Sequence, residues 1–283
     1  MEIEKAPDIG FCFGVRRAVD MLEKVVAERG RLETLGAVVH NQQVLERLER
    51  MGVTVARDIK DIRGDAVAIS SHGVSPQVEA ELKAKELDII NTICPAVHRA
   101  QVTARRLAEA GFLVVIYGEA NHPEVKGLLG WAGDKGIATM DSSFISGLGR
   151  IPRRIGILSQ TTQIPSQFVA FLKEVLDSAF TRDSEFRAID TICHDIRKRQ
   201  ADALDLAKKV DIMLVIGGRS SANTRHLAEL CATVTETHHI ETADDIRRSW
   251  FRGKRHIGVT SGASTADQTI DEVLVRMAEL AGR

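Results

Sequence analysis

The sequence predicts an α/β protein built from three similar lobes, each with a small, mainly parallel sheet. Short β-branched runs alternate along the whole chain with helical-period segments of about ten to sixteen residues, which is the pattern of βαβ units. Three of the four cysteines also lie in matching sequence frames, and a polar residue follows each of them at one shared spacing. A chain of 283 residues is long enough for more than one domain and for a sizeable core.

Six short apolar runs are the predicted strands. They are Thr34–Val39, Val67–Ile69, Leu113–Tyr117, Ile155–Leu158, Ile212–Ile216 and Ile257–Val259. A polar loop follows each run, at the place where strands end and helices begin. Open α/β sheets bind ligands at that edge, so we expect the functional residues to lie there.

The cysteine frames reveal an internal repeat of about ninety residues. They read Gly-Phe-Cys12-Phe-Gly-Val15-Arg-Arg-Ala-Val, Thr-Ile-Cys94-Pro-Ala-Val97-His-Arg-Ala-Gln and Thr-Ile-Cys193-His-Asp-Ile196-Arg-Lys-Arg-Gln. A polar residue stands 28 positions after each cysteine, at His40, His122 and Ser221. A second polar loop follows 60, 67 and 71 positions after the cysteines, at His72, Thr161 and Ser264. Units of this size bury little surface alone, and we expect three of them to pack around a pseudo-threefold axis.

Such an arrangement would bring Cys12, Cys94 and Cys193 to one centre. Three thiolates without a Cys-x-x-Cys pair do not fit a structural zinc site, which needs four ligands. They fit a 4Fe-4S cluster in which one iron lacks a protein thiolate and stays open to a substrate. Cys231 falls outside the frames, in an apolar helical stretch, and is predicted to be a buried structural thiol.

The polar loops predict a small pocket for a phosphate or diphosphate. His40, His72 and His122 occupy equivalent loops, which favours a shared function over three separate structural roles. The segments Ser221-Ala222-Asn223-Thr224 and Gly262-Ala263-Ser264-Thr265 resemble helix-entry nests, whose amides and hydroxyls hold anions. Simple helix capping is the alternative interpretation of both segments.

Glu124 stands two residues after His122, in the first turn of a predicted helix. It could serve as a proton donor if burial and nearby negative charge raise the pKa of its carboxyl. The alternative is an ordinary first-turn glutamate, favoured there by the helix dipole. The sequence alone leaves both readings of this carboxylate open.

Composition excludes several classes of partner. The chain has 38 Lys and Arg against 39 Asp and Glu, a net charge of -1, and only 4% aromatic residues, so nucleic-acid binding is not expected. The longest apolar stretches, such as Phe112–Tyr117, fall far short of the ~18 residues of a membrane span. The amino terminus resembles neither a secretory signal nor a transit peptide, and scattered cysteines favour a reducing compartment, so we expect a cytoplasmic protein.

The motifs together resemble one enzyme family along nearly the whole chain. In order, they are GFCFGV, VVHNQQV, SSHGVSP, TICPAVHRAQ, GEANHPEVKGLLGW, SQTT, DTICHDIRKRQ, GGRSSANTRHLAEL, HHIETADDI and GVTSGAST. This series resembles the 4-hydroxy-3-methylbut-2-enyl diphosphate reductases, the last enzymes of the non-mevalonate (methylerythritol phosphate) isoprenoid pathway.

The resemblance implies a specific reaction and a specific set of site residues. Family members are three-lobed α/β iron-sulfur oxidoreductases that convert (E)-4-hydroxy-3-methylbut-2-enyl diphosphate into isopentenyl and dimethylallyl diphosphate, with ferredoxin or flavodoxin as electron donor. The substrate oxygen approaches the open iron of the 4Fe-4S cluster. The implied roles are cluster ligation by Cys12, Cys94 and Cys193, diphosphate binding by His40, His72, His122, Ser221, Asn223 and Ser264, contact with the substrate hydroxyl by Thr161, and proton delivery by Glu124.

The resemblance also implies limits for the lobes and shows two departures. The expected lobes are residues 14–95, 96–191 and 192–283, with residues 1–13 packing on the third. Many members have Ala-Thr where this chain has Asp195-Ile196, and a serine where it has Ala222, so two hydroxyls near the site are missing. These changes bear on affinity and rate, while the three cysteines and Glu124 are kept.

Two other classes stay open on the sequence. One is another three-cysteine iron-sulfur enzyme of the quinolinate synthase or hydro-lyase kind, against which the HPEV block and the paired histidine loops argue. The other is a non-catalytic iron-sulfur sensor or structural metal scaffold, which would not need Glu124, Thr161 and three histidines.

Overall fold

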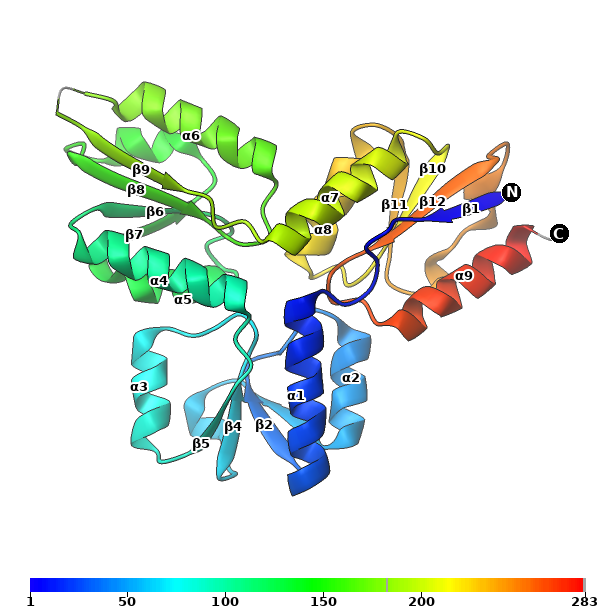
Figure 1. Cartoon of the computed structure of the whole chain (residues 1–283), viewed down its shortest axis with the longest axis horizontal. Helices are drawn as coiled ribbons and strands as arrows, with labels where there is room; N and C mark the ends of the chain where they lie inside the picture. The colour runs from blue at the N-terminus through cyan, green and yellow to red at the C-terminus, as the bar shows by residue number, and fades with distance from the viewer. Residues whose placement is uncertain (182, 282–283) are drawn as a thin grey trace. The chain divides into compact units, whose positions relative to one another are not determined.

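Three four-stranded sheets form the framework of the computed structural model, which describes residues 1–181 and 183–281 (Figure 1). The strands are β1 (Glu2–Lys5), β2 (Leu32–Leu35), β3 (Val53–Ala56), β4 (Ala66–Ile69), β5 (Asp88–Asn91), β6 (Leu113–Tyr117), β7 (Gly136–Thr139), β8 (Arg154–Ser159), β9 (Glu185–Ile189), β10 (Ile212–Ile216), β11 (Glu236–Ile240) and β12 (His256–Ser261). Every pair of neighbouring strands within these sheets is parallel. The predicted α/β class with three small parallel sheets is confirmed.

Helices connect the strands, as parallel pairing requires. They are α1 (Phe13–Arg29), α2 (Gln42–Met51), α3 (Pro76–Ala84), α4 (Pro95–Glu109), α5 (Pro123–Ala132), α6 (Pro165–Ala179), α7 (His194–Ala207), α8 (Ala222–Ala232) and α9 (Asp267–Ala281). Short 3-10 turns lie at Ile59–Asp61, Gly133–Lys135, Ser142–Gly147, Ala243–Asp245 and Arg248–Phe251. No helix within the described residues is long and apolar enough to cross a membrane.

The three sheets share one strand order. They run β3-β2-β4-β5, β7-β6-β8-β9 and β11-β10-β12-β1. In each sheet the first strand of the lobe lies between the second and the third, and a fourth strand lies beyond the third. In the last sheet that fourth place is taken by β1, from the amino terminus of the chain, which pairs with β12. The cysteine repeat of the sequence is therefore also a repeat of topology.

The chain divides into two units, which are described separately. The first contains residues 1–19, 39–51 and 194–283, and the second contains residues 20–38 and 52–193. In the first unit, one apolar core beside the sheet includes side chains of α9, and another includes side chains of α7 and α8. The second unit holds two sheets, with separate cores formed by α3, by α4 with α5, and by α6. The predicted lobe limits remain a prediction.

The six predicted strands are the two central strands of each sheet. A strand that is buried on both faces is a continuous apolar run, as in β10, where every residue is 0% exposed. One boundary was wrong: the run Thr34–Val39 was expected to be a strand, but β2 ends at Leu35. Gly36 follows with a φ of +76°, a left-handed conformation that ends the extended backbone there. Residues after Gly36 are a loop that leads to His40.

Candidate active site

Each frame cysteine occupies the same place in its lobe. It follows the fourth strand of the sheet and precedes the next helix, and its backbone N–H donates to a carbonyl two residues beyond the end of the third strand. These bonds join Cys12 to Ala263 at 3.0 Å, Cys94 to Ser71 at 3.1 Å and Cys193 to Thr161 at 2.9 Å. All three cysteines are partly exposed at the carboxyl edge of their sheets. Three-fold equivalence in the sequence is therefore matched by equivalent backbone bonding.

The fourth cysteine differs in every respect. Cys231 lies on α8, is 0% exposed and packs in the core formed with α7. Burial raises the pKa of its thiol to about 12, so it stays protonated and unreactive at neutral pH. This confirms the expectation of a structural thiol. The other three cysteines keep partly exposed thiols, and thiolate is the ligand type that iron-sulfur clusters use.

Glu124 is buried at the amino end of α5, with 1% of its surface exposed. Both carboxyl oxygens are hydrogen-bonded by one residue: the backbone N–H of Thr161 donates to Oε1 at 2.7 Å, and its hydroxyl donates to Oε2 at 2.8 Å. Burial raises the pKa of Glu124 to about 7, against the lowering effect of the two Thr161 bonds. Negative charge, which we expected to contribute, is not among the causes. The side chain is thus able to hold or release a proton near neutral pH.

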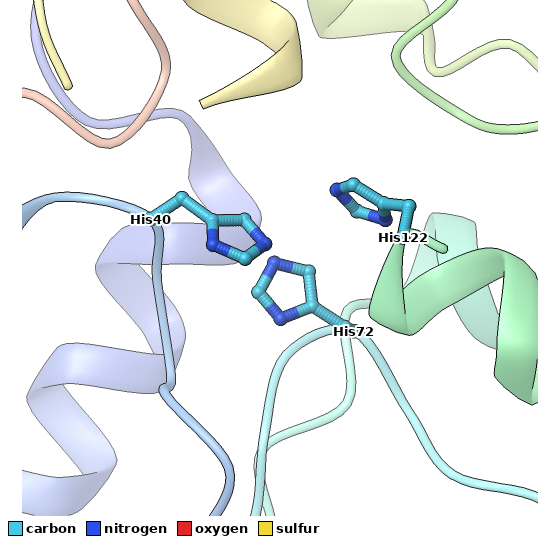
Figure 2. A group of neighbouring side chains, drawn as sticks. All are labelled: His40, His72 and His122. Carbon is cyan, nitrogen blue, oxygen red and sulfur yellow. The ribbon is translucent and has the colours of Figure 1, made fainter. Parts of the chain in front are cut away.

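His72 and His122 lie together in the second unit. Their rings meet edge to face with centroids 5.5 Å apart (Figure 2). His122 is the N-cap of α5, and its Nδ1 accepts the backbone N–H of Glu124 at 3.2 Å. This bond fixes the imidazole of His122 at the start of the helix that carries the buried carboxyl.

Hydrogen bonds from two side chains hold the loop that carries His72. The indole of Trp131 and the amide of Gln101 both donate to the carbonyl of Val74, at 2.9 and 3.2 Å. Ser75 then caps α3 through a bond from the N–H of Val78, with Pro76 in the first turn. These bonds restrict the backbone of the loop just after His72.

In the first unit, two loops meet beyond the adjacent strands β10 and β12. Ser221 is the N-cap of α8 and accepts the N–H of Thr224 at 3.3 Å. The loop after β12, which carries Ser264, approaches so closely that a Cβ on Gly262 would lie 2.0 Å from Thr224 Oγ1. Ser264, in the same loop as Gly262, is 7% exposed. The predicted capping role of Ser221 is present, and it does not exclude an anion at the same helix end.

Asn223 has the clearest capacity for a ligand. It is only 6% exposed, yet neither its side-chain oxygen nor its nitrogen has a hydrogen-bond partner among the residues that the structure describes. A buried amide without partners lowers the stability of the folded protein by about 1–3 kcal/mol, and such groups are rare in native interiors. A bound polar molecule at the end of α8 would satisfy it.

His40 joins the same unit through its backbone. Its carbonyl lies 2.5 Å from the position of a Cβ on Gly218, so only glycine fits in the loop after β10. The cap of α2 is Asn41, whose Oδ1 accepts the N–H of Val44 at 3.1 Å, and His40 stands one residue before it. The 28-residue spacing therefore reaches the cap position in two lobes and the preceding residue in the first.

The predicted site residues divide between the two units. The first unit brings together the loops of His40, Ser221, Asn223 and Ser264 and contains Cys12. The second brings Glu124, Thr161, Cys193 and His122 together and also contains His72 and Cys94. The sequence interpretation missed Thr92 and Thr191, whose hydroxyls hold the segments before two of the cysteines. The repeated Thr-Ile-Cys frame was the signal that could have identified them.

These features define a three-lobed α/β protein that presents one accessible cysteine and two polar strand-end loops in each lobe. The chain belongs to the LytB protein family, whose sequence description matches residues 3–278. Relatives called 4-hydroxy-3-methylbut-2-enyl diphosphate reductase include one from Dehalococcoides mccartyi (strain CBDB1), 60% identical over 96% of both chains. Another, from Pelobacter propionicus, is 41% identical over 99% of both chains. The family resemblance inferred from the motifs is confirmed.

Solved structures give the same result. A structure of (E)-4-hydroxy-3-methyl-but-2-enyl diphosphate reductase, the terminal enzyme of the non-mevalonate pathway, is 37% identical and covers 99% of this chain and 100% of its own, with a TM-score of 0.72. The E-1-hydroxy-2-methyl-but-2-enyl-4-diphosphate reductase from Plasmodium falciparum is 23% identical, with a TM-score of 0.89 over 97% of this chain and 87% of its own. The second likeness shows the fold alone.

Proposed function

We propose that this chain reduces (E)-4-hydroxy-3-methylbut-2-enyl diphosphate to isopentenyl and dimethylallyl diphosphate. The reaction takes up two electrons and two protons, breaks the allylic C–O bond and releases the oxygen as water. The names of the relatives support the substrate class. The observation that carries the proposal is Glu124, a carboxyl that is 1% exposed and has a pKa of about 7, in the unit that also holds Cys94 and Cys193.

Glu124 holds the proton that the leaving oxygen needs. With a pKa of about 7 the carboxyl can be protonated near neutral pH, and the Thr161 hydroxyl, which donates to the ionised carboxyl, can also accept from the protonated one. Thr161 therefore keeps the side chain in one orientation through both protonation states. A positioned acid whose pKa is close to the working pH contributes about 10²- to 10⁴-fold to a rate.

Diphosphate binding falls to hydrogen-bond donors rather than to an arginine or lysine clamp. Asn223 offers an amide without partners, and the amino end of α8 offers backbone N–H groups beside it. Ser221, Ser264 and the three histidines supply hydroxyl and imidazole donors in the strand-end loops of the two units. The balanced overall charge of the chain is consistent with a local anion site of this kind.

Cys12, Cys94 and Cys193 are the residues that would hold a 4Fe-4S cluster. When bound, such a cluster supplies electrons and a Lewis-acidic iron, with ferredoxin or flavodoxin as the external donor. The chain contributes three partly exposed thiols whose backbone N–H groups are already fixed to the strand-end loops. Ligand positions that are ordered in this way reduce the entropy lost when the metal centre assembles.

An anaerobic assay tests the proposal directly. Full-length protein, reconstituted with iron and sulfide and supplied with reduced methyl viologen, is expected to consume the allylic diphosphate and release both isoprenoid diphosphates. Serine in place of Cys12, Cys94 or Cys193 should abolish the visible absorbance of the cluster and the turnover. Cys231→Ser is the matched control and should keep both. A wild-type protein that carries a cluster but forms neither product would refute the reductase and favour a sensor or another cluster enzyme.

A further inference from the structure

Two of the three cysteines are preceded by the same threonine clamp. Thr92 and Thr191 each stand two residues before a cysteine, and their hydroxyls donate to the carbonyl of the last residue of the third strand in the same lobe. These bonds join Thr92 to Ile69 and Thr191 to Ser159, both at 2.5 Å. The clamp fixes the turn between the fourth strand and the cysteine.

The third lobe cannot use this clamp. The position two residues before Cys12 is Gly10, which has no side chain. A threonine would be strained there, because φ is +85°, and its Cβ would also displace the side chain of Asp267, whose Oδ1 would lie 2.4 Å away. The connection is also longer, since six residues separate β1 from Cys12, whereas two separate β5 from Cys94. A longer connection has more conformational freedom to lose.

In the third lobe, Arg199 makes the hydrogen bond that the threonine hydroxyl makes in the other two lobes, and it does so from a different element. It lies on α7, and its Nη1 donates at 3.0 Å to the carbonyl of Ser261, the last residue of β12 and the counterpart of Ile69 and Ser159. Its Nη2 donates at 2.9 Å to the carbonyl of Gly10. The N–H of Gly10 donates in turn to Oγ of Ser261 at 2.8 Å, which closes the contact.

The repeat shows that this arginine is special to its lobe. Arg199 stands six residues after Cys193, and the residues six after the other two cysteines are Ala18 and Ala100. Alanine cannot reach a neighbouring loop, and both of these side chains are buried in ordinary packing. The guanidinium of Arg199 is itself 4% exposed, which is a costly place for a charge unless it has a purpose.

We propose that Arg199 is a positioning residue for Cys12. Its side chain replaces the threonine clamp of the other two lobes, and it places a fixed positive charge beside this one cysteine. The proposal rests on the proposed function, because the charge matters for a redox centre held by Cys12. Arginine remains protonated in proteins. A fixed cation near a cluster stabilises the state with the additional electron, so it raises the reduction potential.

The charged groups around Arg199 agree with this role. Burial lowers the pKa of Arg199, and the groups that oppose the lowering are Cys12 first, then Asp8, Asp195 and Asp202. Asp8 also forms an ion pair with Lys198. The charge of Arg199 therefore interacts with Cys12 as well as with these three carboxylates.

Two variants separate the clamp from the charge. Arg199→Met keeps the length of the side chain and removes both donors and charge, whereas Arg199→Lys keeps the charge and cannot make the forked pair of bonds. Thr191→Val is the matched variant for another lobe. Arg276→Met, on the surface of α9, is the control for loss of one positive charge.

Hydrogen exchange of the full chain reports the clamp without any need for a cluster. Arg199→Met and Arg199→Lys should speed exchange of the Gly10 and Cys12 amides by about tenfold or more, the effect of losing a buried hydrogen bond to a charged group. Thr191→Val should instead speed exchange at Cys193, and Arg276→Met should change neither. Unaltered exchange at Gly10 and Cys12 in both Arg199 variants would overturn the clamp.

The reduction potential of the reconstituted protein, measured by spectroelectrochemical titration, reports the charge. We expect Arg199→Met to shift the potential to more negative values and Arg199→Lys and Arg276→Met to leave it close to that of the wild type. An equal potential in Arg199→Met and the wild type would overturn the electrostatic role. If the wild type takes up no cluster, the proposed function fails, and the exchange measurement still decides whether Arg199 fixes the Cys12 segment.

Discussion

Glu124 and Asn223 occupy the same place in two lobes and have opposite hydrogen bonding. Each stands two residues after the polar residue that caps the second helix of its lobe, His122 in one and Ser221 in the other. Both side chains are more than nine-tenths buried. Both oxygens of Glu124 are bonded by Thr161, whereas neither polar atom of Asn223 has a partner among the described residues. One position is complete within the protein and suits proton transfer, and the other is incomplete and suits ligand binding.

Replacing Glu124 should have the largest effect. Glu124→Gln keeps the shape and a hydrogen-bonding amide but cannot release a proton, so we expect kcat to fall by about 10² or more with little change in substrate affinity. Steady-state kinetics under anaerobic conditions measure both. Glu79→Gln, at the first turn of α3, is the matched control and should retain full activity. A kcat near that of the wild type in Glu124→Gln would remove this carboxyl from the chemistry.

Stability should depend on pH through the same carboxyl. The pKa of Glu124 rises from 4.5 in the unfolded chain to about 7 in the folded one. Below pH 4.5 the group is protonated in both states and has no effect. Between pH 4.5 and about 7 only the unfolded chain ionises, so stability is lost across this window, by about 3 kcal/mol in total.

Chemical denaturation at several pH values measures that loss. Glu124→Gln has no proton to exchange, and its free energy of unfolding should fall less steeply than that of the wild type between pH 5 and 7. Parallel pH profiles for the two proteins would show that the folded carboxyl titrates normally.

Asn223 should show a smaller effect with the opposite sign for stability. Asn223→Leu replaces an amide without partners by an apolar side chain of similar size, so we expect the unliganded protein to gain about 1 kcal/mol of stability. The Kd for the allylic diphosphate should rise about tenfold, because a donor to the substrate is lost. Thermal unfolding with and without substrate measures both, and Gln77→Leu, at an exposed position on α3, is the control. A loss of stability in Asn223→Leu would show that the amide has a partner within the protein.

Thr161 tunes the carboxyl and should produce the smallest change. Its hydroxyl bond favours the ionised form of Glu124, so Thr161→Val should raise the pKa of that carboxyl. Activity depends on the protonated form, and the decline of kcat at alkaline pH should therefore begin at a higher pH than in the wild type. A decline at the same or a lower pH would indicate that the hydroxyl does not act on Glu124.

The sequence was sufficient to predict the central strands of each sheet and the internal repeat. It was insufficient to predict the edge strands. Central strands such as β10 are continuous apolar runs, and these were predicted. Edge strands such as β1, with the sequence EIEK, and β11, with ETHHI, are partly exposed and carry polar residues, so nothing in their composition distinguished them from loops. That β1 completes the last sheet depends on a contact across nearly the whole chain, which no local pattern encodes.

The site residues that recur in the three-fold sequence repeat could be predicted. Those that differ from their counterparts in the other lobes could not. Matching spacing singled out the cysteines and the strand-end loops. Arg199 is one of the deviations, since it aligns with Ala18 and Ala100, and its role could not be predicted because it depends on the conformation of Gly10. The bonds between Thr161 and Glu124, and the absence of bonds to Asn223 within the described chain, follow from packing between distant segments.

The protonation state of Glu124 is the most direct test of this account. The infrared difference spectrum between the wild type and Glu124→Gln isolates the C=O stretch of the protonated Glu124 carboxyl as the pH is varied. We predict that this band persists to near neutrality and disappears with a midpoint at a pH of about 7. A band already lost by pH 5 would mean that Glu124 is an ordinary ionised glutamate, and the proton-donor role would be contradicted.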